Sequence, residues 1–362
     1  MQDMLAERHI NKIIDKLGYE RHDDFSERRK IFIIFILLGL VILAGVISLT
    51  LGAYNISVDL VYKTLFIHLT MGDISSISKL HNTIIWDIRF PRLILAISVG
   101  GALAIAGAVF QSVFRNPLVE PYILGVSSGA AFGAALGILF HSIFFSIQIF
   151  AFIFATLAVV FAYSLARVRG QTPIVTLILA GVIVGSIFSA LVSFLKYIAN
   201  DSALREIVFW LMGGFYYASW NDVIMLTPMV LIGFIILWSL AWKLNILSMG
   251  DEEARTLGVS PEKNKAIVIA IATAVTAFSV SLVGIIAWVG LMMPHASRLL
   301  LGPDNRFVIP ACFLMGAFYL LVCDTLARTI TMTEIPIGII TSLLGAPYLC
   351  YLLRNKGKSI LG

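Results

Sequence analysis

The stretch RFPRLILAISVGGALAIAGAVFQSVFRNPLVEPYILGVSSGAAFGAALG, residues 89–137, decides the fold class. Arg89 and Arg92 precede an uncharged run, Leu93–Phe114, and the polar turn 115–117 separates that run from a second one rich in Gly, Ser and Ala. About 20 apolar residues is the length that crosses a bilayer as a helix. Small residues at helical spacing let such helices pack closely. The stretch therefore predicts a hairpin of closely packed membrane helices with its charges at the ends.

The composition of the whole chain agrees with a membrane protein. Hydrophobic residues make up 59% of the 362, charged residues 13%, and the mean hydropathy is +0.94. A soluble domain carries about 25% charged residues, so that class is excluded. The run 121–166 contains no Asp, Glu, Lys or Arg, and it predicts a fold-back near His141-Ser142 because it is too long for one span. Residues 1–30 form a polar leader without a small-residue cleavage site, so the first span is expected to be retained.

We predict an all-α, polytopic membrane protein with a cytoplasmic leader over 1–30 and a single ten-helix transmembrane domain over 31–362. A short amphipathic piece, 204–212, is expected at the surface. The predicted spans are 31–51, 93–114, 121–140, 146–166, 172–196, 223–243, 266–283, 285–301, 307–326 and 336–353.

An even number of spans puts both termini on one side of the cell membrane, and the basic residues predict that this side is the cytoplasm. Seven of the 26 Lys and Arg then face outward, which leaves 19 inside, as the positive-inside rule requires. The net charge of +5 follows from this bias and from attraction to anionic lipid, so no nucleic-acid partner is expected. The seven are Lys63, Lys79, Arg89, Arg92, Lys196, Arg205 and Arg328.

The sequence carries no recognisable enzyme chemistry. It has no HExxH, no paired CxxC and no Gly-rich loop followed by Lys-Ser/Thr, and its histidines do not cluster at ligand spacing. We therefore predict no catalytic residue, no metal site and no cofactor bound by this chain. Without a nucleotide site of its own, any transport against a gradient must draw on an ion gradient or on a partner.

The segment 247–261 favours a partner. Asp251–Leu257 is predicted to form two helical turns ended by Gly258, with its acids and Arg255 toward water. Ala254 and Leu257 would face an apolar groove, which is the pattern of helix-in-groove docking. The alternative is a solvated connector. The residues predicted to couple to a partner are Asp251, Glu252, Glu253, Ala254, Arg255, Leu257 and Gly258.

Eight motifs resemble a known family. The chain is similar to the permease subunits of the binding-protein-dependent, ATP-driven importers for iron–siderophores, haem and vitamin B12. The resemblance runs from Gly52 to the C-terminus and leaves out the leader. The motifs, in order, are RFPR (89–92), GA.AI.GAVFQ (101–111), NPLVEPYILGVSSGA (116–130), LAGV (179–182), FWLMGGF (209–215), GDEEARTLGV (250–259), VGLMMPHASRLLLGPDNR (289–306) and EIPIGIITSLLGAPYL (334–349).

The resemblance implies a type II importer fold and an assembly. Two copies of the permease would form a central pathway, two ATP-hydrolysing subunits would bind below, and an extracytoplasmic binding protein would deliver the ligand. Arg89, Arg92 and Arg328 match the docking arginines of the family. Complementary charge there would fix the register of docking and speed encounter. The alternative is that Arg89 and Arg92 only anchor the helix end at the lipid headgroups.

The same resemblance assigns the cytoplasmic end. Asn116 and Leu118 match an inner gate, and Ile174 and Val175 fall in a second gate segment. There the sequence departs from the small hydroxyl residues of the family, although an apolar constriction can also close a pore by excluding water. Segment 247–261 matches the short helices that sit in a groove of the ATPase subunit.

Four ionisable residues stay with two interpretations each. Asp324 and Glu334 either orient Arg328 or satisfy one another, and His295 and Arg298 are expected to have a helix-end role in preference to binding a metal.

The predicted function is transport and not catalysis: a permease subunit that imports a metal chelate, with ATP hydrolysed by a separate subunit. Ferric siderophore is the first candidate, followed by cobalamin and haem. The competing classes are an ion-gradient-driven transporter, for which the spans lack a central acid, and a membrane scaffold or receptor.

Overall fold

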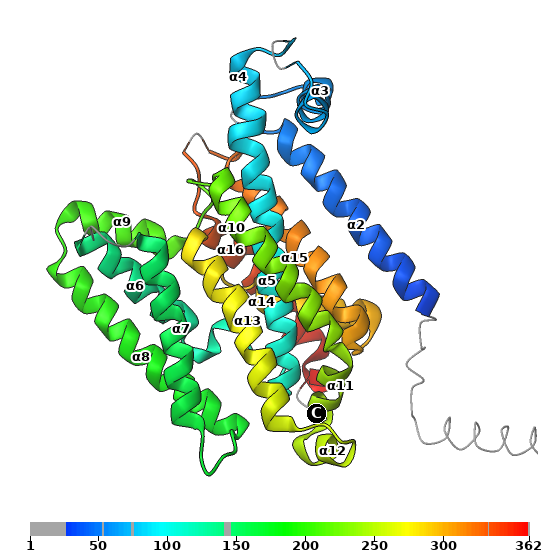
Figure 1. Ribbon diagram of the computed structural model, residues 1–362, viewed down its shortest axis with the longest axis vertical. Helices are drawn as coiled ribbons and strands as arrows, with labels where there is room; N and C mark the ends of the chain where they lie inside the picture. Colours follow the sequence, from blue (N-terminus) through cyan, green and yellow to red (C-terminus); the bar gives the residue numbers. More distant parts are fainter. Residues whose placement is uncertain (1–26, 53, 74–75, 141–145, 332, 361–362) are drawn as a thin grey trace, which may run out of the picture.

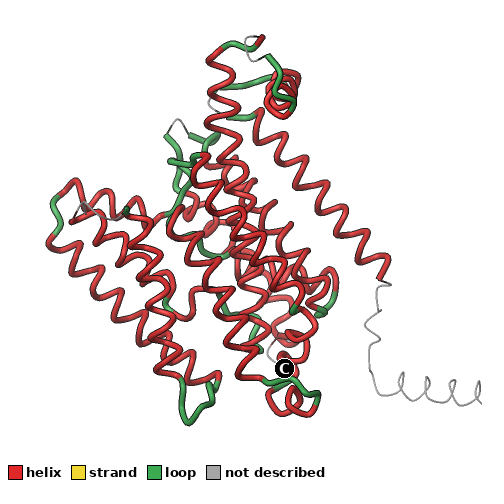
Figure 2. The backbone as a smooth tube through the Cα atoms, viewed as in Figure 1, coloured by secondary structure: helices red, strands yellow, loops and turns green. Residues whose placement is uncertain are grey.

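The computed structural model is built of helices and has no strand in the residues it describes, which are 27–52, 54–73, 76–140, 146–331 and 333–360 (Figures 1 and 2). For residues 352–353 and 355–360 it describes the backbone alone. Most of the leader, residues 1–26, and the predicted fold-back at His141-Ser142 lie outside the described residues. Within the described residues, a single β-bridge joins Val168 and Gln171 and closes the loop before α8.

The helices follow the predicted apolar runs. The short helices are α3 Val58–Leu69, α4 Lys79–Asn82, the π-helix η2 Thr83–Arg89, the 3₁₀ turn η3 Pro121–Leu124, α9 Asp201–Met212, α11 Ala241–Met249 and α12 Asp251–Thr256. The others are α2 Glu27–Thr50, α5 Phe90–Phe114, α6 Val126–Phe140, α7 Ile147–Ala166, α8 Ile174–Ile198, α10 Trp220–Ser239, α13 Pro261–Val283, α14 Val289–Leu301, α15 Asn305–Ala327 and α16 Ile337–Ile360.

Seven described helices are long and apolar enough to cross a membrane, and each of the ten predicted spans overlaps a helix. Two of the α-helices start later than predicted, because the chain makes the 3₁₀ turn η3 before α6 and the non-helical stretch 284–288 before α14. The all-helical, multi-pass membrane fold is confirmed, while full-length helices over 121–140 and 285–301 were wrong.

The predicted hairpin between 93–114 and 121–140 is also wrong. α5 packs on α15, α14, α13 and α10, whereas α6 packs on α7 and α8. Figure 1 shows α6, α7, α8 and α9 as a group beside the body built around α5, with α7 lying against α13. The link 115–125 carries the chain from one group to the other.

Close packing by small residues is confirmed, with different partners. A methyl group at Gly107 would collide with the backbone of Gly290 on α14, and one at Gly316 on α15 would collide with the carbonyl of Gly100. These contacts bring helix backbones together, as small residues allow in membranes. As a result, α5 is held at two levels and is almost fully buried.

The stretch between α13 and α14 is non-helical inside the bundle. Gly290, just after this stretch, lies against Leu103 and Gly107 of α5. These two residues precede the end of α5 by 11 and 7 positions, so the stretch lies about 10–17 Å inside the bundle from that end. Backbone groups at membrane depth need partners from the protein. Tyr122 donates its hydroxyl to the carbonyl of Ile286 at 2.8 Å.

Candidate functional site

Three helices bring the predicted docking arginines together at one end of the bundle, the end that carries α4 (Figure 1). Arg92 is at the centre of an ion-pair cluster. Its Nε donates to Asp324 Oδ1 at 2.8 Å, and its Nη1 lies 2.9 Å from both carboxylate oxygens of Glu334. Arg92 is 7% exposed and the Asp324 side chain 1%. Both charges of this pair are therefore satisfied inside the chain.

Arg89 and Arg328 close the end of α2. The last carbonyls of a helix have no partner within it and attract cations. Arg89 Nη1 donates to the carbonyls of Leu49 and Thr50 at 2.6 and 3.1 Å. Arg328 Nη1 donates to the carbonyl of Leu51 at 2.6 Å, and its Nε lies 3.4 Å from Asp324 Oδ2.

These contacts decide between the two interpretations of Asp324 and Glu334. Asp324 orients two arginines, and Glu334 pairs with Arg92, which the sequence analysis had not foreseen. Arg89, at 7% exposure, donates to backbone carbonyls of its own chain. The role of the three arginines in docking stays a prediction, and any such role starts from side chains that already have partners.

Two exposed cations at this end lie on the extension beyond α5 and on the helix next to it. α4, η2 and α5 form one continuous helix of 36 residues, which at 1.5 Å per residue is about 54 Å long. The hydrocarbon core is about 30 Å thick, so the α4 part projects beyond it. Lys79 on α4 and Lys63 on the neighbouring α3 are both exposed. The sequence analysis placed both outside but gave neither a role.

The opposite end carries α12. Lys265, buried at the start of α13, donates to Asp251 Oδ2 at 2.6 Å. Ala254 is fully buried in a small apolar cluster with Ile246, Leu247 and Val259. Two anchors therefore fix this short helix to α11 and α13.

The predicted helix over 251–257 is confirmed as α12, and the outward direction of Glu252, Glu253 and Arg255 is too. The prediction that Ala254 faces a partner is wrong, because the residue packs within its own chain. Leu257 is 53% exposed, and Gly258 is exposed and follows the helix, in a left-handed conformation that suits glycine. Arg255 and Gly258 border an open hollow of about 370 Å³.

The predicted gate residues lie at the ends of two helices. The turn after α5 is fixed by Asn116, whose Oδ1 accepts a hydrogen bond from the N–H of Leu118 at 2.9 Å. Leu118 is 45% exposed and Val175, at the start of α8, is 68% exposed, whereas Ile174 packs against the main core. Each segment thus offers one exposed apolar side chain, and the gating role of all four residues stays a prediction.

A polar network that the sequence analysis missed joins α11 to the turn after α5. Asn245 Oδ1 accepts from the backbone N–H of Asn305 at 2.8 Å and from its side chain at 2.9 Å. Asn305 Oδ1 accepts from Ser112 on α5 at 3.2 Å, and Arg298 Nη2 donates to Ser112 at 3.3 Å. Gln111, which accepts from Arg298, donates to the carbonyl of Leu291 at 3.1 Å and of Val119 at 3.4 Å.

Arg298 is a cation without an acid near it. No Asp or Glu lies within ion-pair distance of Arg298 in the part of the chain that the structure describes, and its donors go to Gln111, Ala108 and Ser112. His295 and Arg298 both lie on α14. The hydrogen bonds from Arg298 to α5 support a structural role for this arginine. The signal for the network was the presence of polar residues inside apolar runs.

Asp304 fixes the start of α15 to the same network. Its carboxylate accepts from Asn245 Nδ2 at 2.7 Å and from the backbone N–H of Arg306 at 2.9 Å. Burial alone would raise the pKa of Asp304, but hydrogen bonds from Arg306 and Asn245 outweigh it and lower the pKa. The carboxylate is therefore charged at neutral pH and holds α11 against α15.

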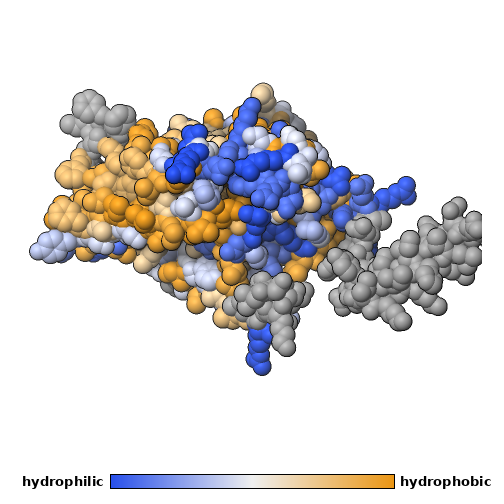
Figure 3. Space-filling view, turned by 90° about the horizontal axis from the view of Figure 1, so that it is seen from below, coloured by the Kyte–Doolittle hydropathy of each residue, from blue (hydrophilic) through white to orange (hydrophobic). Residues whose placement is uncertain are grey.

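Polar side chains gather at the α12 end, and the flank of the bundle is apolar (Figure 3). Both ends of the described chain lie at this end, since Glu27 is 3.7 Å from Arg306 and Figure 1 marks the C-terminus beside α12. Among the described residues, no group of three or more His, Cys, Asp or Glu could hold a metal ion. The fold is that of a multi-pass membrane protein with a fixed surface helix at one end and a buried arginine cluster at the other.

Comparison with known proteins identifies the family. Residues 40–355 match the FecCD transport family, and the chain belongs to it. It is therefore a permease subunit of an ABC importer, a transport subunit and not a catalytic one.

Two relatives and one solved structure are especially similar to the chain. A cobalamin import system permease protein of Halobacterium salinarum is 44% identical over 75% of this chain and 74% of its own length. A molybdate import system permease protein of Haemophilus influenzae is 40% identical over 90% of this chain and 97% of its own length. The structure of a metal-chelate type ABC transporter in an inward-facing conformation matches with a TM-score of 0.79 and 36% identity, over 89% of this chain and 98% of the other.

Proposed function

We propose that the chain is the permease of an importer that moves a metal chelate into the cytoplasm as an intact complex. Two copies would form the pathway in the cell membrane, with both termini in the cytoplasm. Two ATPase subunits would bind at the α12 end, and an extracytoplasmic binding protein would dock at the α4 end. The chain itself would bind no cofactor, and ATP would be used by the partner.

The way α12 is held is the observation that carries this proposal. A docking helix can move a membrane bundle only if it is fixed to that bundle. α12 is fixed by Ala254 and by the Asp251–Lys265 pair, and the network through Asn245 continues to α15 and α5. Glu252, Glu253, Arg255 and Leu257 remain outward for an ATPase groove.

ATP binding shifts the bundle only through its different affinity for the two states. A displacement of α12 would be transmitted through α11 to the turn after α5, where Leu118 lies. The proposed gates, Asn116 with Leu118 and Ile174 with Val175, would then open or close by moving apolar side chains apart or together. Such a constriction excludes water when closed.

Reconstitution tests the proposal. The permease is placed in proteoliposomes with the ATPase subunit and the binding protein of its own system, and uptake of a labelled ferric siderophore is measured with and without ATP. We expect ATP-dependent uptake, and we expect loss of ATPase binding when Leu257 and Arg255 are replaced by Asp and Glu. A Glu206→Lys variant on α9, which is exposed and far from α12 in Figure 1, is the control. Failure of the ATPase to co-purify with the wild type would contradict the importer.

The ligand is proposed as a ferric siderophore first, then cobalamin and haem. The similarity to a metal-chelate type transporter and to a cobalamin permease supports a metal complex. The molybdate relative makes a small oxyanion the competing ligand class. Competition in the same uptake measurement separates them: unlabelled cobalamin, haem or molybdate will inhibit if it shares the pathway and its binding protein.

One observation favours the ion-driven alternative. The non-helical stretch before α14 has an acid beside it, because the carboxylate of Glu120 lies close enough to the backbone of Trp288 to interact with it. Trp288 has a left-handed backbone, φ 76°, and strained residues of this type cluster at functional sites. Broken helices with an acid are typical of ion-coupled transporters. The sequence analysis overlooked Glu120 because it lies in a turn and not in a span.

A Glu120→Gln variant decides between the two classes. Gln keeps the size of Glu and an oxygen that can face the backbone of Trp288, but it cannot carry a proton or bind a cation as a carboxylate does. We expect ATP-dependent uptake within about twofold of wild type, because an acceptor oxygen is retained and a single hydrogen bond contributes only about 1 kcal/mol. Uptake driven by a pH gradient without ATP, abolished by this variant, would establish the ion-driven alternative.

A further inference from the structure

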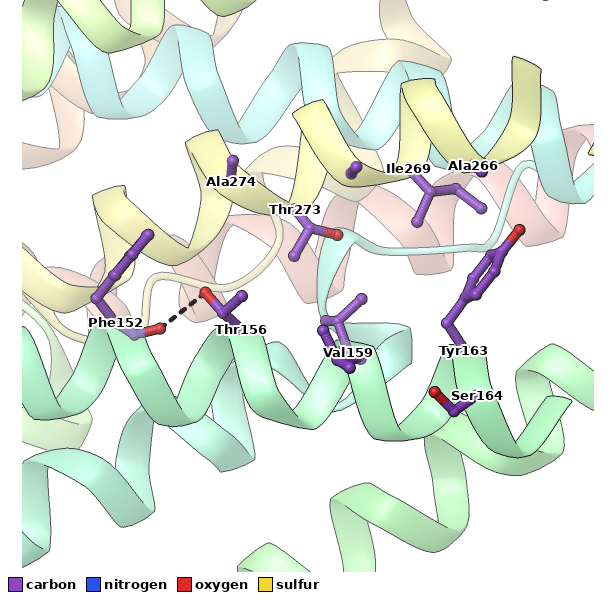
Figure 4. Close-up of a pocket in the computed structure, with 11 residues that line it drawn as sticks. Phe152, Thr156, Val159, Tyr163, Ser164, Ala266, Ile269, Thr273 and Ala274 are labelled. Atoms are coloured by element: carbon purple, nitrogen blue, oxygen red, sulfur yellow. Dashed lines mark hydrogen bonds between the residues drawn. The ribbon is translucent and has the colours of Figure 1, made fainter. Parts of the chain in front are cut away.

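A long apolar groove runs along the membrane-facing side of the bundle between α7 and α13. Its volume is about 330 Å³, and it extends from Phe152 to Ser164 on α7 and from Ala266 to Ala274 on α13. Figure 4 shows α7 and α13 as its two walls, with the lining side chains between them. Val160, on its rim, is 50% exposed, so the groove opens onto the apolar flank of the protein.

The length and direction of the groove match one leaflet of a bilayer. On α7, Phe152 and Ser164 are twelve positions apart, which corresponds to about 18 Å along the helix. Half of a hydrocarbon core is about 15 Å. Tyr163 and Ser164 mark the end nearer α12, because α7 ends two residues later and α13 begins directly after α12. The groove therefore runs from the polar end of the molecule toward the middle of the membrane.

Both walls of the groove lead to a cation. On α7, the lining positions Tyr163 and Ser164 are followed one turn later by Arg167, and on α13 Ala266 is preceded one turn earlier by Lys263. Arg167 and Lys263 are both exposed. No ion pair with an acid is formed by either within the described chain.

The acid nearest to these cations in the sequence is already engaged. Glu262 accepts a hydrogen bond from the N–H of Thr172 at 3.0 Å, which ties the loop after α7 to the start of α13. This contact holds the loop that carries Arg167 beside Lys263. A negative group at the headgroup level would meet two cations there, with an apolar groove directly below.

We propose that this groove binds an anionic phospholipid, with one acyl chain between α7 and α13 and the phosphate between Arg167 and Lys263. Basic pockets between membrane helices on the cytoplasmic side bind acidic headgroups. One polar atom in the groove, Thr273 Oγ1, has no hydrogen-bond partner, and an acyl chain would not provide one. A threonine in a membrane helix can satisfy its hydroxyl by bonding to the carbonyl four residues earlier, so this atom does not conflict with a bound lipid. The site is independent of what the protein transports.

The test uses the full-length permease in detergent and two lipids with the same acyl chains, phosphatidylglycerol and phosphatidylcholine. A photoactivatable phosphatidylglycerol with a diazirine on its acyl chain is added and the labelled peptides are identified. We expect labelling within 152–164 and 266–274. We expect Ala270→Phe, which fills the groove, to abolish it, and Ile232→Phe on the exposed face of α10 to leave it unchanged.

Binding of the two lipids is then measured by native mass spectrometry. One basic residue near an anionic surface contributes about fivefold in affinity, so the double variant Arg167→Gln/Lys263→Gln is expected to lose about 25-fold for phosphatidylglycerol and much less for phosphatidylcholine, whose choline cation offsets the charge of its phosphate. Arg205→Gln is the control, because Arg205 is an exposed cation on α9.

Three results would overturn the proposal. The first is labelling spread evenly over the exposed apolar helices, and the second is equal affinity of the wild type for both lipids. The third is a disulfide that forms in membranes between a Cys at position 160 of one copy and a Cys at position 270 of another. The last result would show that a second copy of the chain, and not a lipid, covers the groove.

Discussion

At the scale of single residues, the arginine that matters most for the fold is Arg92. It is 7% exposed and neutralises two carboxylates, one of which, Asp324, is almost completely buried. Removing one partner of a buried ion pair is costly because it leaves the other charge unpaired. Replacing Arg92 by Glu would collect three acids there, so a loss of docking in that variant would not distinguish docking from folding.

We expect Arg92→Leu to destabilise the protein by about 3–5 kcal/mol and the double variant Arg92→Leu/Asp324→Leu to recover part of this loss, because it removes both charges. Thermal denaturation in detergent measures both, and Arg205→Leu, at an exposed position on α9, is the control. Equal stability of wild type and Arg92→Leu would contradict the structural role and leave docking as the remaining role.

Docking is better tested at exposed residues of the same end that lie outside the arginine cluster. Lys63 and Lys79 are exposed on α3 and α4, and a change there leaves the arginine cluster intact. We expect Lys63→Glu/Lys79→Glu to slow binding-protein association several-fold at low salt and little at high salt, since surface charges act mainly on encounter. Surface plasmon resonance at two ionic strengths measures this. An unchanged rate at low salt would remove both lysines from the docking surface.

At the scale of elements, α11 and α12 act as one unit. Asn245 on α11 meets both Asn305 and Asp304 at the start of α15, so it is the joint through which α12 would push on the bundle. We expect Asn245→Leu to leave ATPase binding intact and to lower the uptake per ATP hydrolysed by about tenfold, a loss equivalent to roughly 1.4 kcal/mol of coupling. Uptake and phosphate release are measured together in proteoliposomes.

The control for this variant is Ser248→Ala on the same helix, because the Ser248 hydroxyl is exposed and donates to the carbonyl of Asn245 at 2.6 Å, outside the network. If Asn245→Leu and Ser248→Ala give the same ratio of uptake to hydrolysis, the network does not transmit the motion. A loss of ATPase binding in Asn245→Leu would instead show that Asn245 only supports the docking surface.

At the scale of the whole molecule, the distribution of charge predicts its orientation. The α12 end carries both ends of the described chain and most of the basic residues, so we place it in the cytoplasm. A single Cys at Lys79 should react with a membrane-impermeant maleimide added to intact cells, and one at Arg169 should react only after permeabilisation. The three native cysteines are first replaced by Ala, and the reverse pattern would invert the topology.

The sequence was sufficient for the fold class and the approximate position of every long helix, because apolar length alone determines a span. It was not sufficient for helix partners. α5 and α6 are neighbours in sequence, yet α5 packs on α14 and α15 through Gly290 and Gly316, which are about 200 residues away. It also could not show that Arg92 and Glu334 meet, or that Ala254 faces inward, since both depend on how distant helices are arranged.

The glycine contacts of α5 have a consequence for movement. At Gly107–Gly290 and Gly100–Gly316 the helix backbones lie so close that no side chain fits between them, so we expect α5, α14 and α15 to move together. The described residues of the α6–α9 group make no such glycine contact with α5, and the group packs on the body through α13, so we expect the link 115–125 to act as a hinge. Spin labels on α8 and α10 should therefore change their separation between nucleotide states, while labels on α5 and α15 should keep theirs.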